Sequence, residues 1–250
     1  MPLPVGANGV TRNDAELAFG PNAGQFRADV AFVARTRINQ VFVLGDGRIV
    51  HALPIASTGA ESVSAWVVVE ELPGAAVAPI GARLSDQRVS WFSTATSPSV
   101  SDTRSFSTLK WSDAWPGVDM LLHVVGDRTE RVFRVEPGAD WRRIALAYDG
   151  ARFEPDAGGG LIARDRDVVL TLSVPVAFQD TPEGRVPVDV RYVVAADGAR
   201  VSFEVGAYDE HLPLTIDPVL QATYFGFGGT STSVQPLAVL HDRPKGTCPG

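Results

Sequence analysis

Four of the five tryptophans, Trp91, Trp111, Trp115 and Trp141, lie close together in the sequence. Flat indole faces stack well on sugar rings, so this group could form an aromatic platform for a glycan. Large rings also fill the space between two packed sheets, because each one buries a large apolar area. The sequence favours the core-filling interpretation and leaves the glycan platform as the alternative.

Hydrolysis of a glycan needs two carboxyl groups, about 5–10 Å apart. The candidates are Asp119, Asp140, Asp209 and Asp217. Asp119 and Asp140 each follow a Pro-Gly pair, and Asp217 precedes Pro218. At such places an aspartate closes a turn by accepting backbone N–H groups. We therefore predict turn roles, and no residue is predicted to be catalytic. The residues kept as possible glycan or partner contacts are Trp91, Trp111, Trp115, Trp141, Asp119 and Asp140.

Other common chemistries leave no motif in the sequence. There is no nucleophile elbow, zinc-protease motif, phosphate-binding loop or dinucleotide fingerprint, and nothing after Gly226-Phe227-Gly228-Gly229 reads as a helix. The four histidines show no metal-binding spacing, Cys248 is the only thiol, and His123 reads as a strand residue. We therefore predict no cofactor and no metal.

Charge and hydropathy limit the partners. The formal net charge is −7, and no run of lysine or arginine provides a nucleic-acid surface. No apolar stretch approaches the roughly 20 residues of a membrane span. The first twenty residues contain no signal peptide pattern.

The hydrophobic pattern has a period of two, which predicts strands. Residues 41–53 predict a hairpin around Gly45-Asp46-Gly47, and residues 188–205 predict a second around Asp197-Gly198. Further strands are expected at 30–34, 65–72, 120–125, 131–135, 144–148, 160–164, 167–172 and 174–179. Helical signal is weak, and its best window, 104–114, could equally be a loop. The 24 glycines and 18 prolines suit turns between strands. The expected fold is all-β, an antiparallel β-sandwich with little helix that could divide into two β lobes.

The domain organisation follows from composition. Residues 1–18 read as a flexible arm, 19–220 as the sandwich domain, and 221–250 as a truncated or degenerate propeller repeat and tail. The polar stretches 54–64 and 93–108 are predicted to be long surface connections. A seam between two lobes is expected near 100–118.

Several strings taken in order resemble a known bacterial domain. They are Asn22-Ala23-Gly24-Gln25, VAFVAR (30–35), AWPGVDMLLH (114–123), FRVEPGADWRRIALAYDGA (133–151) and GAYDEHLPLTIDPVL (206–220). This set is similar to the N-terminal domain of bacterial proteins that carry SBBP repeats, which are β-propeller repeats. The string 224–229, YFGFGG, is similar to the opening of a first repeat.

The sequence also departs from that family. Trp115 stands where the family usually has tyrosine, Trp141 stands where proline is common, and the continuation of the repeat is missing after residue 234. We therefore expect no propeller within this chain, and we hypothesise a truncated gene product or a degenerate relative.

The resemblance implies a secreted or cell-surface β-domain that precedes a propeller, with no catalytic residues to transfer. The leading hypothesis is a noncatalytic structural or interaction module whose partner is a neighbouring β-propeller domain or another protein. The alternative is a glycan-binding or glycan-hydrolysing domain. Phe133 and Phe203 are predicted to lie between the two sheets.

Overall fold

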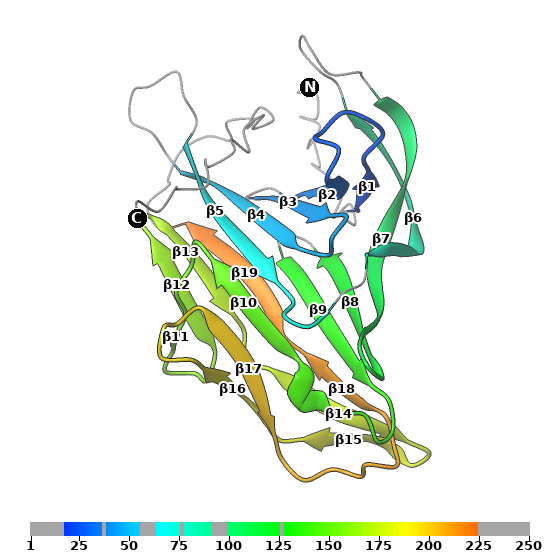
Figure 1. Cartoon of the computed structure of the whole chain (residues 1–250), viewed down its shortest axis with the longest axis vertical. Helices are drawn as coiled ribbons and strands as arrows, with labels where there is room; N and C mark the ends of the chain where they lie inside the picture. The colour runs from blue at the N-terminus through cyan, green and yellow to red at the C-terminus, as the bar shows by residue number, and fades with distance from the viewer. Residues whose placement is uncertain are drawn as a thin grey trace, which may run out of the picture.

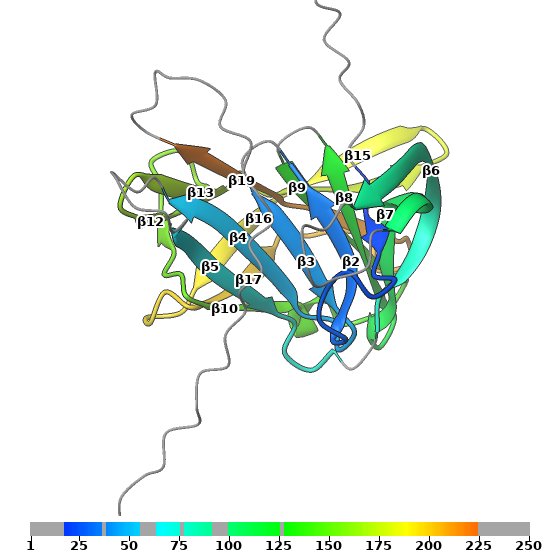
Figure 2. The same cartoon turned by 90° about the horizontal axis from the view of Figure 1, so that it is seen from above.

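The chain folds into two large antiparallel sheets, as Figure 1 shows for a computed structural model that describes residues 18–36, 39–55, 64–75, 78–91, 100–125 and 128–224. These sheets pack face to face, and the predicted all-β antiparallel sandwich is confirmed. The one helical element among the described residues is a short 3₁₀ turn, η1 (Trp141–Arg143). A second view shows the blue and cyan strands of one sheet lying across the other sheet (Figure 2).

The first sheet, called sheet I here, has eight strands. In spatial order they are β1 (Gly20–Pro21), β2 (Val30–Arg35), β3 (Gln40–Leu44), β4 (Ile49–Ile55), β5 (Ser64–Glu71), β10 (Ala145–Asp149), β17 (Arg200–Val205) and β16 (Val190–Val194). Both predicted hairpins are present in it, as β3–β4 and β16–β17.

The second sheet, sheet II, has eleven strands. Four of its strands pair in chain order, namely β6 (Ile80–Trp91), β7 (Val100–Trp115), β8 (Val118–Val125) and β9 (Arg128–Val135). One wing continues through β19 (Val219–Tyr224), β13 (Val168–Leu172), β12 (Leu161–Asp165) and β11 (Glu154–Pro155). The other wing continues through β18 (Leu214–Asp217), β14 (Val176–Thr181) and β15 (Gly184–Val188).

The two wings separate at Pro218. Strand β9 pairs with β18 along one half of its length and with β19 along the other half. Pro218 lies between these two strands and has no N–H to donate, while its carbonyl accepts the N–H of Arg131 at 3.1 Å. Strands β18 and β19 therefore both pair with β9, but on their other side β18 pairs with β14 whereas β19 pairs with β13.

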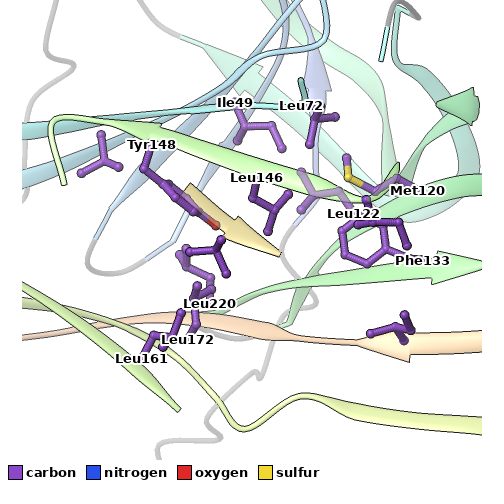
Figure 3. Packing of buried hydrophobic residues seen from close by; sticks show 14 of the residues in the cluster. Ile49, Leu72, Met120, Leu122, Phe133, Leu146, Tyr148, Leu161, Leu172 and Leu220 are labelled. Carbon is purple, nitrogen blue, oxygen red and sulfur yellow. The ribbon is translucent and has the colours of Figure 1, made fainter. Parts of the chain in front are cut away.

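The core lies between the two sheets and is built from the inward-facing, alternate residues of the strands in both sheets. Figure 3 shows Leu146 and Tyr148 of sheet I facing Leu172 and Leu220 of sheet II. Phe133 is fully buried and meets the ring of Phe203 edge to face at 5.7 Å between centroids. The predicted position of these two phenylalanines between the sheets is confirmed.

The β3–β4 hairpin turns where the sequence predicts it. Gly47 adopts φ = 93°, a conformation that glycine reaches without a steric penalty. Arg48 donates its backbone N–H to Asp46 Oδ1 at 3.2 Å, and Leu44 donates to Arg48 O at 2.8 Å. The turn is thus closed by the side chain of Asp46 as well as by the backbone.

The predicted surface connection at residues 93–108 is corrected by the structure from residue 100 onward. Residues 100–115 form β7, which is hydrogen bonded to β6 and to β8 and so lies inside sheet II. Ser105, Ser107 and Thr108 are buried there. Ser105 donates its hydroxyl to Gln87 O and Thr108 Oγ1 lies 3.0 Å from His123 Nδ1, whereas Ser107 Oγ has no hydrogen-bond partner among the described atoms. The helical alternative for 104–114 is therefore wrong, and residues 93–99 lie outside the described part.

Several other boundaries also shift. Pro54 and Ile55 belong to β4, Ser64 begins β5, and the rest of the predicted connection, 56–63, is outside the described residues. Val188, predicted to begin the second hairpin, is instead the last residue of β15 in sheet II, where it pairs with Ala177. Only Asp189 separates β15 from β16 of sheet I. The segment predicted to be an arm (1–18) is described only at residue 18. The predicted tail is described to Tyr224, where β19 ends.

Candidate functional site

The tryptophans predicted as a possible glycan platform are core residues wherever their side chains are described. Trp111 is 0%, Trp115 2% and Trp141 8% exposed. Trp111 donates its indole N–H to Gly47 O at 3.2 Å, and Trp115 donates to Pro73 O at 2.8 Å. These three rings present no open face to a sugar, so the glycan hypothesis loses its main support. Trp91 ends β6, and its side chain is outside the described atoms.

Asp119 holds a turn and an ion pair on β8. Its Oδ1 accepts the N–H of Asp113 at 2.8 Å, and its Oδ2 lies 2.6 Å from Lys110 Nζ. Burial alone would raise the pKa of Asp119, but the hydrogen bonds from Lys110 and from the Asp113 N–H outweigh it and lower that pKa. The carboxylate is therefore held ionised, and its hydrogen-bonding role is structural.

Asp140 caps the 3₁₀ turn η1. Its Oδ1 accepts the N–H of Arg142 at 3.2 Å, and its side chain is exposed between Arg142 and Arg143. The same pattern holds at Asp209, whose Oδ1 accepts the N–H of His211 at 2.9 Å. The predicted turn role is therefore present at Asp140, and Asp209, for which no turn role was predicted, has one as well.

Asp217 does not have the turn role that its sequence context predicts. It is the last residue of β18, and its Oδ1 is buried with no hydrogen-bond partner among the described atoms. Burial raises the pKa of Asp217, and the negative charge of Glu130 raises it further. A raised pKa is a property of general acids, but Asp217 does not line the hollow beside the β3–β4 turn.

One hollow of about 250 Å³ opens beside the β3–β4 turn. Its walls are the turn residues Asp46–Arg48, the segment Glu71–Pro73 after β5, Ala75 and Trp111. Asp46 and Arg48 form an ion pair at 2.8 Å, so their charges largely cancel at the mouth. Ligand pockets are commonly about 300–1,000 Å³ and mostly apolar, and this hollow is smaller and its mouth is charged.

The sandwich encloses a charged cluster that the sequence reading missed. Glu70 of β5, His51 of β4 and Arg131 of β9 are each 0% exposed. Arg131 Nε donates to Glu70 Oε1 at 2.5 Å, and Arg131 Nη2 donates to Glu70 Oε2. His51 Nε2 lies 3.5 Å from the same Oε2. Because Glu70 and Arg131 come from different sheets, this bidentate pair links the two layers.

The protonation states inside this cluster follow from burial and from the ion pair. Burial would raise the pKa of Glu70, but the positive charge of Arg131 and the hydrogen bond from His51 lower it, so Glu70 is ionised. Burial lowers the pKa of His51, so the imidazole is neutral near pH 7. Burial also raises the pKa of Tyr148, whose strand partner is Glu70. These groups have no solvent access and lie in the core between the two sheets.

Strand parity is the signal that could have found this cluster. His51 lies two residues from Ile49 and two from Leu53, and Arg131 lies two residues before Phe133, so each charged or polar residue shares a strand face with buried apolar residues. A charged residue at an inward position needs a buried partner. The sequence thus marks both residues as paired core groups, although it does not reveal which strand supplies the partner.

The described residues contain no group of three or more His, Cys, Asp or Glu side chains placed to hold a metal ion. Among them there is also no helix of the length and apolarity required to cross a bilayer.

Comparison with known proteins identifies one family. Residues 19–219 match the family described as a domain of unknown function, DUF7948. No curated protein and no solved structure matches the chain significantly.

Proposed function

The chain belongs to the DUF7948 family, a domain of unknown function, and from this premise we propose that it is a noncatalytic structural and interaction module. The proposal rests first on how its ionisable groups are used. Glu70 and Arg131 join the two sheets, while Asp119 and Asp140 hold turns. These groups serve the fold, so the function is more reasonably placed on the surface.

The observation that carries the interaction role is the open edge of β6. Among the described strands β6 pairs with β7 alone, so no described strand pairs with the N–H and C=O groups of its other edge. Ile80 and Leu84 on this strand are 54% and 57% exposed. An open edge with apolar side chains is suited to a partner that adds a strand through backbone hydrogen bonds.

The same strand is protected against indiscriminate pairing. Its register with β7 shifts at several points, and Arg83, Asp86 and Arg88 lie along it. Bulges and charges on an edge strand prevent random association between sheets. A partner of β6 therefore needs a matching shape and complementary charges, which makes the edge selective.

The resemblance to the domain that precedes SBBP repeats supports the identity of the partner and the location. In this proposal the protein is exported or displayed on a bacterial cell surface, and β6 contacts a neighbouring β-propeller. These assignments rest on the quoted sequence strings alone.

Isothermal titration of the full chain against a separately expressed SBBP-type propeller domain tests the proposal. We expect binding that Ile80→Lys and Leu84→Lys weaken by about tenfold or more, since either change places a charge in the contact. The matched control is Val193→Lys, an exposed valine on β16 at the edge of sheet I. Equal affinity for all variants, or release of sugar that depends on Asp119 or Asp140, would contradict the proposal.

A further inference from the structure

The edges of the described sheets are protected against pairing, with one exception. In sheet II, β6 is bulged and charged, β15 contains Pro187, and β11 is only two residues long and ends at Pro155. In sheet I, β1 is also two residues long and ends at Pro21. Short strands, bulges, charges and prolines are the features that keep an edge strand from pairing with another chain. The remaining edge strand of the described sheets is β16.

Strand β16 is regular, and its single charge is balanced within the chain. It has five residues, VRYVV, and each of them pairs with β17 without a break in register. Valine and tyrosine favour extended backbone. Arg191 donates to Glu204 of β17 at 2.6 Å. No described strand pairs with the other edge of β16, so this edge is suited to receive a further strand.

The side chains of β16 remain accessible at this edge. Val193, on the outward side of the strand, is 43% exposed. On the inward side Tyr192 and Val194 are only partly buried, whereas the residues that they face on β17, Phe203 and Val201, are 5% and 1% exposed. Burial therefore decreases from β17 to β16, as expected for the last strand of a sheet.

The sequence of β16 is complementary to itself. In an antiparallel pair, residues that lie opposite each other point to the same side of the sheet. When two copies of β16 pair around Tyr192, Arg191 of one copy lies opposite Val193 of the other, and Val190 lies opposite Val194. All five residues are then paired and no like charges meet. A register around Arg191 would instead place the two arginines opposite each other.

We propose that β16 is a homodimer interface, in which two copies of the chain pair their β16 strands antiparallel around Tyr192. Sheet I then continues from one copy into the other across a two-fold axis. The contact occupies the β16 edge of both copies, so the assembly closes at two chains and does not grow into a fibre. This interface is independent of the contact proposed for β6, which lies on the other sheet.

Analytical ultracentrifugation of the full chain over a range of concentrations tests for the dimer. We expect a monomer–dimer equilibrium in the wild type. Val193→Lys places a lysine opposite Arg191 of the second copy, twice in each dimer, and should weaken the dimer by about tenfold. The matched variant Val193→Glu places a charge at the same exposed site but opposite an arginine with which it can pair. Its dimer should therefore be at least as tight as that of the wild type.

Two results of this measurement would overturn the proposal. One is a wild-type chain that stays monomeric at its highest soluble concentration. The other is an equal dimer affinity for Val193→Lys and Val193→Glu, because the two variants differ only in the sign of the charge that Arg191 of the second copy meets.

Disulfide trapping tests the register. In a Cys248→Ser background, chains with Arg191→Cys are mixed with chains with Val193→Cys and oxidised. Opposite residues of an antiparallel pair have Cα atoms about 4.5–5.5 Å apart, which a disulfide can span. We expect a disulfide between the two variants in higher yield than one between two copies of either variant.

The control for trapping mixes Arg191→Cys with Ser202→Cys. Ser202 faces Val193 on β17, one strand further from the interface, so this mixture should give no disulfide between the two variants. Equal yields from the test and control mixtures, or a higher yield between two chains that both carry Arg191→Cys, would contradict pairing around Tyr192.

Discussion

Arg131 of sheet II and Glu70 of sheet I form a two-point ion pair at a place where neither side chain has any solvent exposure. Two charges in an apolar interior lose their hydration, and their mutual attraction must offset that loss. Removing one partner therefore leaves the other charge buried alone. The pair makes the packing of the two sheets depend on this contact.

Glu70→Gln should lower the free energy of unfolding by about 3–5 kcal/mol, since it leaves the Arg131 guanidinium buried without a counter-charge. Urea unfolding followed by tryptophan fluorescence measures the loss. Glu204→Gln is the control, because Glu204 forms an exposed pair with Arg191 across β16 and β17, and it should leave the midpoint unchanged. Equal midpoints for Glu70→Gln and Glu204→Gln would contradict the role of the buried pair.

Replacing both partners gives the opposite outcome. The double variant Glu70→Leu with Arg131→Met should regain most of the stability that Glu70→Gln loses, because two apolar side chains of similar volume need no counter-charge. If the double variant is as unstable as Glu70→Gln, packing at these positions is the dominant factor and the electrostatic explanation fails.

The neutral state of His51 predicts a fall in stability under mild acid. Burial lowers the folded-state pKa of His51 below 6.5, so as the pH falls below about 6.5 the unfolded chain takes up a proton that the folded chain refuses. The free energy of unfolding should therefore decrease between about pH 8 and pH 5. Unfolding titrations at these two pH values should show a smaller decrease in His51→Gln.

His123 provides the comparison for this pH effect. Its pKa is also lowered by burial, but His123 is half-buried on the outer face of β8, where its Nδ1 lies 3.0 Å from Thr108 Oγ1. His123→Gln should therefore change the pH dependence less than His51→Gln does. If the free energy of unfolding fell equally with decreasing pH in wild type and in His51→Gln, His51 would not titrate as described.

The contact between Phe133 and Phe203 predicts both a large loss and a coupling. Either alanine substitution should lower the free energy of unfolding by about 3–5 kcal/mol, since it leaves a cavity between the sheets. The double variant should lose about 0.5–1.5 kcal/mol less than the sum, because the edge-to-face contact is then counted once. Chemical unfolding of the two single variants and the double variant measures this, and strict additivity would contradict a direct contact.

The alternation of apolar residues was enough to predict the sandwich and most strands of sheet I. At β3, Val41 and Val43 face one side while Phe42 and Leu44 face the other, and the hairpin follows from the glycines around Asp46. Local sequence determines this much because period and turn chemistry are both short-range.

Long-range pairing is what the sequence could not supply. Strand β7 contains Ser105 and Ser107, which are polar in isolation and buried in the sheet, so its sequence reads as a loop. The Glu70–Arg131 pair joins residues far apart in the chain, and the separation of sheet II at Pro218 depends on a contact with β9. None of these relationships leaves a local pattern.

Asp217 provides the sharpest contrast between sequence and structure. Its position before Pro218 predicts a turn-closing carboxylate, whose loss would cost about 1 kcal/mol. In the structure its Oδ1 is buried without a partner, and burial together with the charge of Glu130 raises the pKa of Asp217.

Ionising Asp217 above its folded-state pKa therefore destabilises the fold. Asp217→Asn should raise the free energy of unfolding by about 0.5 kcal/mol at neutral pH, a value kept small because the side chain is only half-buried. The gain should disappear below the ordinary pKa of an aspartate, about 3.8, where the carboxyl group is neutral in both states. Unfolding titrations of wild type and Asp217→Asn at neutral and acid pH test this, and a loss of stability at neutral pH would restore the turn-closing role.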